Sequence, residues 1–511
     1  MKKFLVGLML MLGIGCGIKP PIKPPQPPPT QAFAVVTYDY NTGAPVEGVA
    51  VSCKADELPQ TFTGSTNGDG YIAWDSVRTG YQYACSLTKE GYEDNTVRHD
   101  VTVEDPTLYA TITKLPPSIP EFPPTLVGRL RITNNCFADD TGCVTPVYEH
   151  AGDLFSKYTR EPEVAISQLN EVASAGYSGI RLWAVLGGDY WAGREVGPGV
   201  SVDYWGKVDS FLRELQLRNL RAVWSMGDIG QLRGTRADYM RALAERDGGA
   251  IDFLDCGNEA WQTGEPDPNK LSECVGYYRA AGGQAILTLT SPPGEETREL
   301  NDYSIGNAQI FDVHGYRGGN FWDKIRHIFS ISYEGRPNKR QGIQSEPFGN
   351  GRLVSVTQNK DELDGETMAL ASIMSALSRQ TWVHFSGEGV MLDKGLQTES
   401  GFFETPKATA LLPKDIATFP VLHHSGGTWA SIRILVPPND NIRVDGAQHP
   451  DGRVVQLIYG PSGSYRFQVA RTVLGKLCNP ATAQCDPVNW IAGSFVDMSF
   501  IRGRVFIGQI Q

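Results

Sequence analysis

The sequence lacks both an excess of basic residues and the cysteine spacing of a zinc site. Its 46 Lys and Arg residues are outnumbered by 57 Asp and Glu residues, which gives a formal net charge of -11. This balance argues against nucleic acid as a partner, because phosphate binding needs clustered basic side chains. The 9 Cys residues show no two-residue spacing of the zinc-knuckle kind, and the chain has only 8 His residues. We therefore expect no metal site.

The apolar run at residues 4–14 is too short to span a bilayer. It follows Lys2 and Lys3 and leads through Gly15 to Cys16, so residues 1–16 resemble a bacterial lipoprotein signal with Cys16 as the lipidated residue. Gly13 stands where such signals usually carry Leu, and simple secretion remains the alternative. We expect an exported lipoprotein of the cell surface or outer membrane that meets the membrane only through a lipid anchor.

The other eight cysteines support export. They fall into couples that are near in sequence, which are Cys53 with Cys85, Cys136 with Cys143, Cys256 with Cys274, and Cys478 with Cys485. An even set of this kind favours disulfides formed in an oxidising compartment. The pairing itself stays open, because several connectivities fit the same set.

Two proline-rich stretches, 17–31 and 116–124, are expected to be extended linkers, since proline fixes φ and removes a backbone donor. Between them, residues 32–115 show short strands and turns at the spacing of a small β-sandwich. The turn segments 43–49, 66–71 and 89–92 resemble those of the carboxypeptidase-regulatory-like domain, which implies an accessory prealbumin-type sandwich. Residues 428–511 again show short strands and predict a small C-terminal β domain.

Residues 125–427 alternate between strand and helix patterns. The predicted strands are 126–132, 179–186, 220–226, 251–256, 285–290, 310–313, 341–345 and 381–385. The predicted helices include 162–175, 204–217, 236–245, 269–281 and 362–378. Eight alternating strands over this length predict an α/β fold of the (β/α)8 TIM-barrel type. A doubly wound sheet is the second possibility, which the absence of a glycine-rich dinucleotide loop after the first strand disfavours.

Two of these strands lead into a glutamate. Residues 251–256 are followed by Asn258 and Glu259, and residues 341–345 are followed directly by Glu346. In a (β/α)8 barrel, the carboxyl ends of the strands form the rim that carries the active site. A retaining glycosidase needs two carboxyl groups about 5 to 5.5 Å apart, one as acid/base and one as nucleophile. This chemistry requires no cofactor, and we expect none.

The barrel with Asn258-Glu259 after its fourth strand and Glu346 after its seventh resembles clan A glycoside hydrolases, which include the family 5 cellulases and mannanases. The resemblance implies that Glu259 is the acid/base, that Asn258 binds a sugar hydroxyl beside the cleavage point, and that Glu346 is the nucleophile. It also implies binding roles for four other residues, which are Arg181 near the nucleophile, His314 and Tyr316 of a His-x-Tyr pattern, and Trp382 as an aromatic floor under the sugar.

Further aromatic residues lie near the predicted strand ends, where sugar faces can stack on their rings. They are Trp183, Tyr190, Trp191, Trp224, Trp261 and Trp322. The sequence therefore predicts a monomeric, exported, retaining glycoside hydrolase that acts on a β-linked poly- or oligosaccharide. Two alternatives stay open, a non-catalytic carbohydrate-binding or adhesin lipoprotein built on the same barrel, and a purely structural surface lipoprotein.

Overall fold

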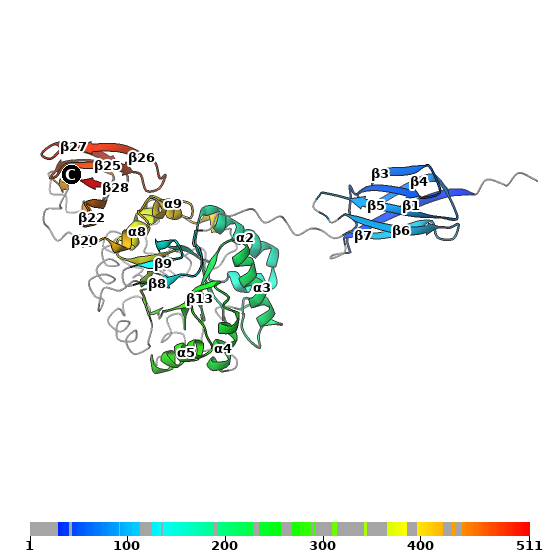
Figure 1. The fold of residues 1–511 in the computed structure, drawn as a ribbon, viewed down its shortest axis with the longest axis horizontal. Helices are drawn as coiled ribbons and strands as arrows, with labels where there is room; N and C mark the ends of the chain where they lie inside the picture. The colour runs from blue at the N-terminus through cyan, green and yellow to red at the C-terminus, as the bar shows by residue number, and fades with distance from the viewer. Residues whose placement is uncertain are drawn as a thin grey trace, which may run out of the picture. The chain divides into compact units, whose positions relative to one another are not determined.

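The structure is a computed structural model, and it describes residues 29–39, 43–90, 92, 94–112, 125–133, 136–187, 192–227, 235–256, 268–288, 290–291, 309–313, 342–344, 365–385, 396–422, 432–434 and 442–511. The chain forms two compact units, Met1–Ile119 and Pro120–Gln511 (Figure 1). The division falls inside the proline-rich stretch 116–124. Among the described residues, every helix is too short or too polar to cross a membrane.

Two sheets enclose the core of the first unit. One has the order β4 (Tyr71–Arg78), β1 (Thr30–Asp39), β7 (Thr107–Ile112), and the other β3 (Thr61–Ser65), β2 (Ala50–Ala55), β5 (Tyr81–Thr88), β6 (Asn95–Val101). Alternate side chains, such as Phe33 and Val35 on β1, fill one shared core, as the two-residue period of a strand requires. Cys53 and Cys85 face each other across β2 and β5 and form a disulfide. The arrangement fits a β-sandwich.

Short parallel strands form the main sheet of the second unit. In sheet order they are β15 (Ile286–Thr288), β14 (Ile251–Asp255), β13 (Arg221–Ser225), β12 (Gly179–Trp183), β11 (Val147–His150), β19 (Gln380–His384), β18 (Gly342–Gln344), β17 (Phe311–Val313) and β16 (Thr290–Ser291). The two end strands, β15 and β16, are separated in the chain by residue 289 alone. They therefore supply one position in a ring of parallel strands, and this order fits a (β/α)8 barrel.

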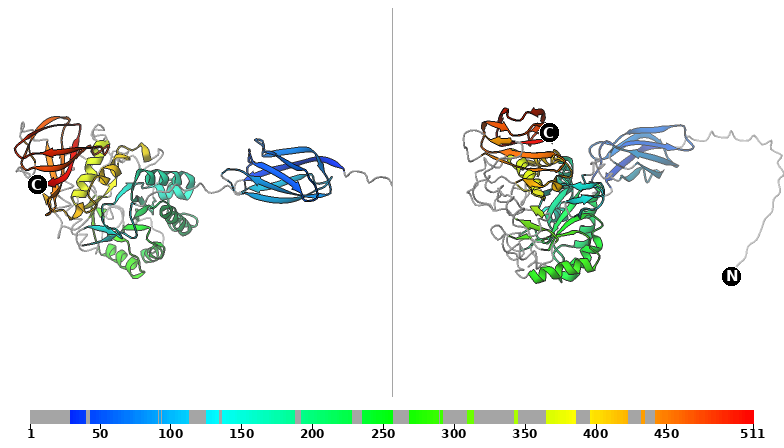
Figure 2. Two further views of the ribbon diagram at one scale, coloured as in Figure 1. Left: turned by 45° about the horizontal axis from the view of Figure 1, so that its top comes forward. Right: turned by 60° about the vertical axis from the view of Figure 1, so that its left-hand side comes forward.

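Helices follow the barrel strands and lie outside them (Figure 2). The bounds of α2 (Pro162–Ala175) and α3 (Tyr204–Leu217) are as predicted, and α4 (Arg236–Arg246), α5 (Pro268–Ala280) and α8 (Gly365–Leu377) are close to prediction. α4 begins where the Thr235 hydroxyl accepts a hydrogen bond from the Asp238 N–H, and α2 ends at Gly176 with a φ of 93°, a conformation that favours glycine. The sequence pattern does not predict the shorter α1 (Leu154–Arg160) and α9 (Glu404–Ala410).

The first barrel strand is β11, and the prediction of segment 126–132 as that strand is wrong. Only β8 (Arg131–Ile132) is a strand there, and it joins β9 (Phe137–Asp139) and β10 (Gly142–Val144) in an antiparallel sheet. The β9–β10 hairpin carries the Cys136–Cys143 disulfide. Leu126 and Leu130 pack with Tyr148 and Phe253 of the barrel. Because this segment leads directly into the start of β11, it covers the end of the barrel at which the strands begin.

The last part of the second unit is all β. One sheet has the order β20 (Val421–Leu422), β22 (Arg443–Gln448), β23 (Arg453–Tyr459), β28 (Gly503–Ile510), β25 (Val473–Cys478), β26 (Cys485–Trp490), and the other β21 (Ile432–Ile434), β24 (Gly463–Val469), β27 (Phe495–Phe500). The Cys478–Cys485 disulfide joins β25 to β26. Glu366 in α8 accepts hydrogen bonds from the Arg502 and Gly503 N–H groups at 3.3 and 3.2 Å, which attaches this region to the barrel.

Candidate active site

A hydrogen bond across the barrel interior fixes the direction of the side chains on its strands. The Tyr148 hydroxyl on β11 donates to Asp252 Oδ2 on β14 at 2.6 Å, and the rings of Tyr148 and Phe253 are in contact. Since β11 and β14 are not neighbours in the sheet, Tyr148 points inward. Side chains alternate along a strand, so His150 also points inward and Glu149 points toward the helices.

His150 and Arg181 form a fully buried pair in the interior. They lie opposite each other on β11 and β12, and Arg181 Nη1 donates a hydrogen bond to His150 Nδ1 at 3.1 Å. A guanidinium group has only donors, so Nδ1 is the acceptor and the imidazole proton lies on Nε2. The positive charge of the pair therefore stays on Arg181.

Two aromatic rings enclose this pair. The Trp183 ring centre lies 5.1 Å from that of His150 and 5.8 Å from Arg181 Cζ. The ring centre of Phe385, directly after β19, lies 4.5 Å from that of His150. Both rings are buried. Trp183 covers the guanidinium of Arg181, and Phe385 packs against the imidazole that binds it. Arg181 thus presents a positive charge in a fixed position on the interior wall.

A second polar group lies at the end of β14. Asp255 Oδ2 accepts hydrogen bonds from the Ser225 hydroxyl at 2.9 Å and from the Thr290 hydroxyl at 3.2 Å. The Ser225 oxygen in turn accepts one from the Gly227 N–H at 3.3 Å. These hydrogen bonds join β13, β14 and β16 near their carboxyl ends. The side chains of Ser225, Asp255 and Thr290 are all buried. The sequence pattern predicts a role neither for this group nor for His150.

The structure brings together two of the predicted substrate-site residues, Arg181 and Trp183. Trp382 does not join them. It alternates on β19 with Val383, whose side chain belongs to the interior cluster, so Trp382 faces the helices. Its prediction as an aromatic floor is therefore wrong, and Phe385 occupies the inward position. Trp224 also faces outward, where its Nε1–H donates to the Tyr239 hydroxyl of α4 at 3.2 Å.

The remaining predictions on individual residues lie outside the described residues. They concern Cys16, Tyr190, Trp191, Asn258, Glu259, Trp261, His314, Tyr316, Trp322 and Glu346. The four predicted cysteine couples are confirmed, because each couple forms a disulfide. One of them, Cys256–Cys274, ties the end of β14 to α5.

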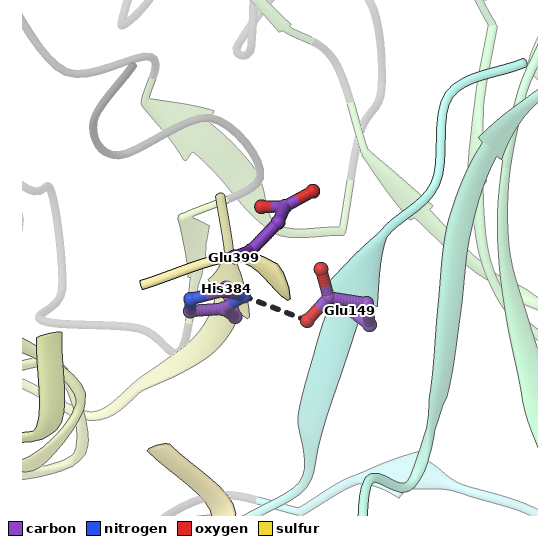
Figure 3. Close-up of side chains that lie close together, drawn as sticks. All are labelled: Glu149, His384 and Glu399. Atoms are coloured by element: carbon purple, nitrogen blue, oxygen red, sulfur yellow. Dashed lines mark hydrogen bonds and ion pairs between the residues drawn. The ribbon is translucent and has the colours of Figure 1, made fainter. Parts of the chain in front are cut away.

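A cluster of ionisable side chains lies on the outer side of the barrel wall (Figure 3). His384 Nδ1 donates to Glu149 Oε2 at 2.7 Å, and His384 Nε2 donates to the Ser400 carbonyl at 2.9 Å. Glu399 follows the 3-10 turn η7 (Leu396–Thr398), and its carboxylate lies close to both Glu149 and His384, within 4.8 Å between their polar atoms. All three charged side chains are buried.

The electrostatics of this cluster favour an ion pair. Burial alone lowers the pKa of His384, but the adjoining Glu149 carboxylate and then Glu399 outweigh it and raise that pKa to about 9. Burial raises the pKa of Glu149, and the His384 charge opposes this. Within the described residues, these three side chains are the one group spaced closely enough to hold a metal ion. Both imidazole nitrogens already donate hydrogen bonds, however, so His384 has no lone pair to offer a metal.

No protein-family model and no curated protein sequence matches this chain. Among solved structures, it is similar to a β-mannanase from Streptomyces thermolilacinus at 19% identity and a TM-score of 0.37, covering 54% of this chain and 89% of that one. It is similar to an α-amylase from Anoxybacillus at 9% identity and 0.47, covering 72% and 98%. It is also similar to a β-glucanase from Saccharophagus degradans at 14% identity and 0.41, covering 57% and 98%. At these scores, the likenesses do not decide the function of the chain.

Proposed function

We propose that the chain is a glycoside hydrolase that cleaves a β-linked poly- or oligosaccharide with retention of anomeric configuration. The observation that carries the proposal is the strand order. Counted from β11, β14 is the fourth parallel strand and is followed in the sequence by Asn258 and Glu259, while β18 is the seventh and is followed by Glu346. Because the carboxyl ends of parallel strands meet at one rim of a barrel, this order supports a shared site for both glutamates.

In this mechanism, Glu346 attacks the anomeric carbon while Glu259 gives its proton to the leaving glycosidic oxygen. The bond to the leaving group breaks and a glycosyl-enzyme ester forms on Glu346. Glu259, now ionised, takes a proton from water, and the resulting hydroxide displaces Glu346 from the anomeric carbon. Asn258 positions the sugar by a hydrogen bond to the hydroxyl beside the cleavage point.

The described part of the barrel supports these roles electrostatically. A nucleophilic carboxylate must be ionised, and a fixed positive charge nearby lowers the pKa of a carboxyl group. Arg181 supplies such a charge, held by His150 and shielded by Trp183. Asp255, bound by two hydroxyl groups, fixes the end of the strand from which the chain continues to Glu259.

The test is hydrolysis of a panel of β-glycans by the wild-type chain and by Glu259→Gln and Glu346→Gln. Glu245→Gln is the matched control, because Glu245 lies on α4 with its side chain 62% exposed. We expect one glycan to be cut by the wild type and the control, with both other variants folded but inactive. The first product should carry the anomeric configuration of the substrate, which proton NMR reads directly. Equal glycan binding by all four proteins without cleavage would instead identify a binding scaffold.

The proposal also includes export and lipidation at Cys16. Four disulfides are characteristic of proteins that fold in an oxidising compartment. Expression of the full chain and of Cys16→Ser in a bacterium tests the anchor. The wild type should sediment with membranes and carry a lipid mass on Cys16, whereas the variant should be soluble. Equal partitioning of the two proteins would favour simple secretion.

A further inference from the structure

The first unit carries a row of aromatic side chains on its outward face. Val36 on the central strand β1 pairs with Tyr71 on β4 and with Tyr109 on β7, so the three residues form one row across the sheet. Their chain neighbours Val35 and Leu108 are buried in the shared core. Because side chains alternate along strands, the row points away from that core. Tyr71 is 44% exposed and Tyr109 is 68% exposed.

The neighbouring rows are uncharged. On one side lie Ala73, Ala34 and Thr107, and on the other lie Tyr38 and Thr111, all at outward positions of the same three strands. We name the outward face formed by Tyr38, Tyr71 and Tyr109, with Val36 between them, the tyrosine face. Every residue of these rows is described, and none is Lys, Arg, Asp or Glu. A neutral ligand therefore matches this face better than an acidic or basic one.

The dimensions of the tyrosine face favour a narrow, extended ligand. Adjacent strands lie about 4.8 Å apart, so the backbones of Tyr71 and Tyr109 are roughly 10 Å apart. This separation is close to the length of two sugar rings in an extended β-linked chain. Three short strands offer roughly 200–300 Å², well below the about 800 Å² per partner that a stable protein interface buries.

We propose that the tyrosine face binds an uncharged, extended β-linked glycan chain. Tyr71 and Tyr109 stack on sugar faces through their rings, while their hydroxyl groups remain able to bond sugar hydroxyls or water. The choice of a β-linked glycan rests on the proposed function of the barrel, because the barrel site and the tyrosine face would then bind the same polymer. The first unit would thereby keep an insoluble substrate attached to the enzyme.

The test is co-sedimentation of the full chain with insoluble mannan and with microcrystalline cellulose. All proteins carry Glu259→Gln in this assay, so the polymer is not degraded. Tyr71→Ala/Tyr109→Ala is compared with Tyr71→Phe/Tyr109→Phe, which keeps the rings. Phe495→Ala is the matched control, because Phe495 is 56% exposed on β27 of the other unit. Thermal unfolding of each variant establishes that it is folded.

We expect the alanine pair to weaken binding to at least one polymer by about tenfold, the loss of two stacking contacts. The phenylalanine pair and Phe495→Ala should bind as the parent protein does. Equal binding by the alanine pair, an equal loss in Phe495→Ala, or no binding by the parent protein would overturn the proposal.

A separate assay distinguishes this proposal from that on the barrel. With Glu259 intact, hydrolysis of a short soluble oligosaccharide should be unchanged by Tyr71→Ala/Tyr109→Ala. If no glycan is hydrolysed but sedimentation depends on the two tyrosines, the tyrosine face stands and the barrel proposal fails. If a glycan is hydrolysed but sedimentation does not depend on the two tyrosines, the barrel proposal stands and the tyrosine-face proposal fails.

Discussion

Arg181 Nη1 lies 3.1 Å from His150 Nδ1 in the barrel interior, and both side chains are fully buried. Removing a guanidinium from water costs several kcal/mol, which an ordered protein offsets with hydrogen bonds and nearby negative charge. His150 supplies one hydrogen bond without adding charge. The pair is therefore suited to act on an anionic group at the carboxyl ends of the strands, and in the proposed function this group is the Glu346 carboxylate.

Arg181→Gln should lower kcat/KM on the cleaved glycan by about 100-fold, the range associated with losing one electrostatic partner of the transition state. The acid limb of the pH profile should also move. Without the positive charge, the pKa of the nucleophile rises, so activity falls off at a higher pH than in the wild type. The measurement is kcat/KM between pH 4 and pH 9.

The control for this prediction is Arg241→Gln, since Arg241 lies on α4 with its side chain 61% exposed. That variant should leave both the rate and the acid limb in place. A large loss of kcat/KM in Arg181→Gln with an unmoved acid limb would contradict the electrostatic role and point to packing alone.

Asp252→Asn should stabilise the protein at neutral pH. Burial raises the pKa of Asp252 to about 6, against an ordinary value of 3.8, even though the Tyr148 hydroxyl donates to it. Because the folded pKa is raised, the charged form costs stability above about pH 6, and this cost disappears as the pH falls below 3.8. Asn keeps an acceptor for Tyr148 and carries no charge. We expect a gain of about 1–2 kcal/mol in the free energy of unfolding at pH 7.5 and of less than about 0.6 kcal/mol at pH 4.

Urea unfolding at the two pH values measures this gain. Asp497→Asn is the comparison variant, because Asp497 is exposed on β27 and its partner Arg466 is exposed as well. It should leave the stability almost unchanged at either pH, because solvent screens an exposed ion pair. Destabilisation of Asp252→Asn at pH 7.5 would show that the ionised carboxylate is needed in the core.

The sequence pattern predicts most barrel elements but misplaces the first strand, for a physical reason. β11 has only four residues, and one of them, Glu149, points outward and is buried. A hydrogen bond from His384, which is 235 positions away in the chain, makes this burial possible. A local pattern cannot anticipate that partner, so β11 looks too polar for a barrel strand. The segment 126–132 has the stronger apolar alternation, which it uses to cover the end of the barrel.

Trp382 shows a second limit. Every residue of β19 is buried, because one face meets the barrel interior and the other meets the helices. With both faces buried, the strand shows no alternation of apolar and exposed polar residues. The sequence therefore does not show which side chains point into the barrel. The nearness of the cysteines in sequence indicates the disulfide couples, by contrast, although only the structure fixes their connectivity.

The Cys256–Cys274 disulfide should matter for activity more than Cys478–Cys485. It closes a segment with a sequence separation of 18 that includes Asn258 and Glu259, whereas the other closes a hairpin with a separation of 7 in the C-terminal sheet. Cys256→Ser/Cys274→Ser should lower the free energy of unfolding by about 3 kcal/mol and reduce kcat at temperatures well below unfolding. Cys478→Ser/Cys485→Ser should affect stability without changing kcat. Equal kcat in the two double variants would contradict a positioning role for the first disulfide.

The ion pair of His384 and Glu149 should make stability fall at alkaline pH. The pKa of His384 is about 9 in the folded chain against 6.5 for an ordinary imidazole. Its contribution is therefore fully present below about pH 6.5 and is lost as the pH rises through about 9, a change of roughly 3 kcal/mol in the free energy of unfolding.

Glu149→Gln/His384→Gln removes both charges together, whereas either single change leaves a buried charge or an unpaired polar group and should cost about 3–5 kcal/mol. Urea unfolding from pH 6 to pH 10 measures the slope, and the wild type should lose this stability relative to the double variant. Parallel curves for the two proteins would show that the pair does not govern the alkaline response, because the other titrating groups are common to both.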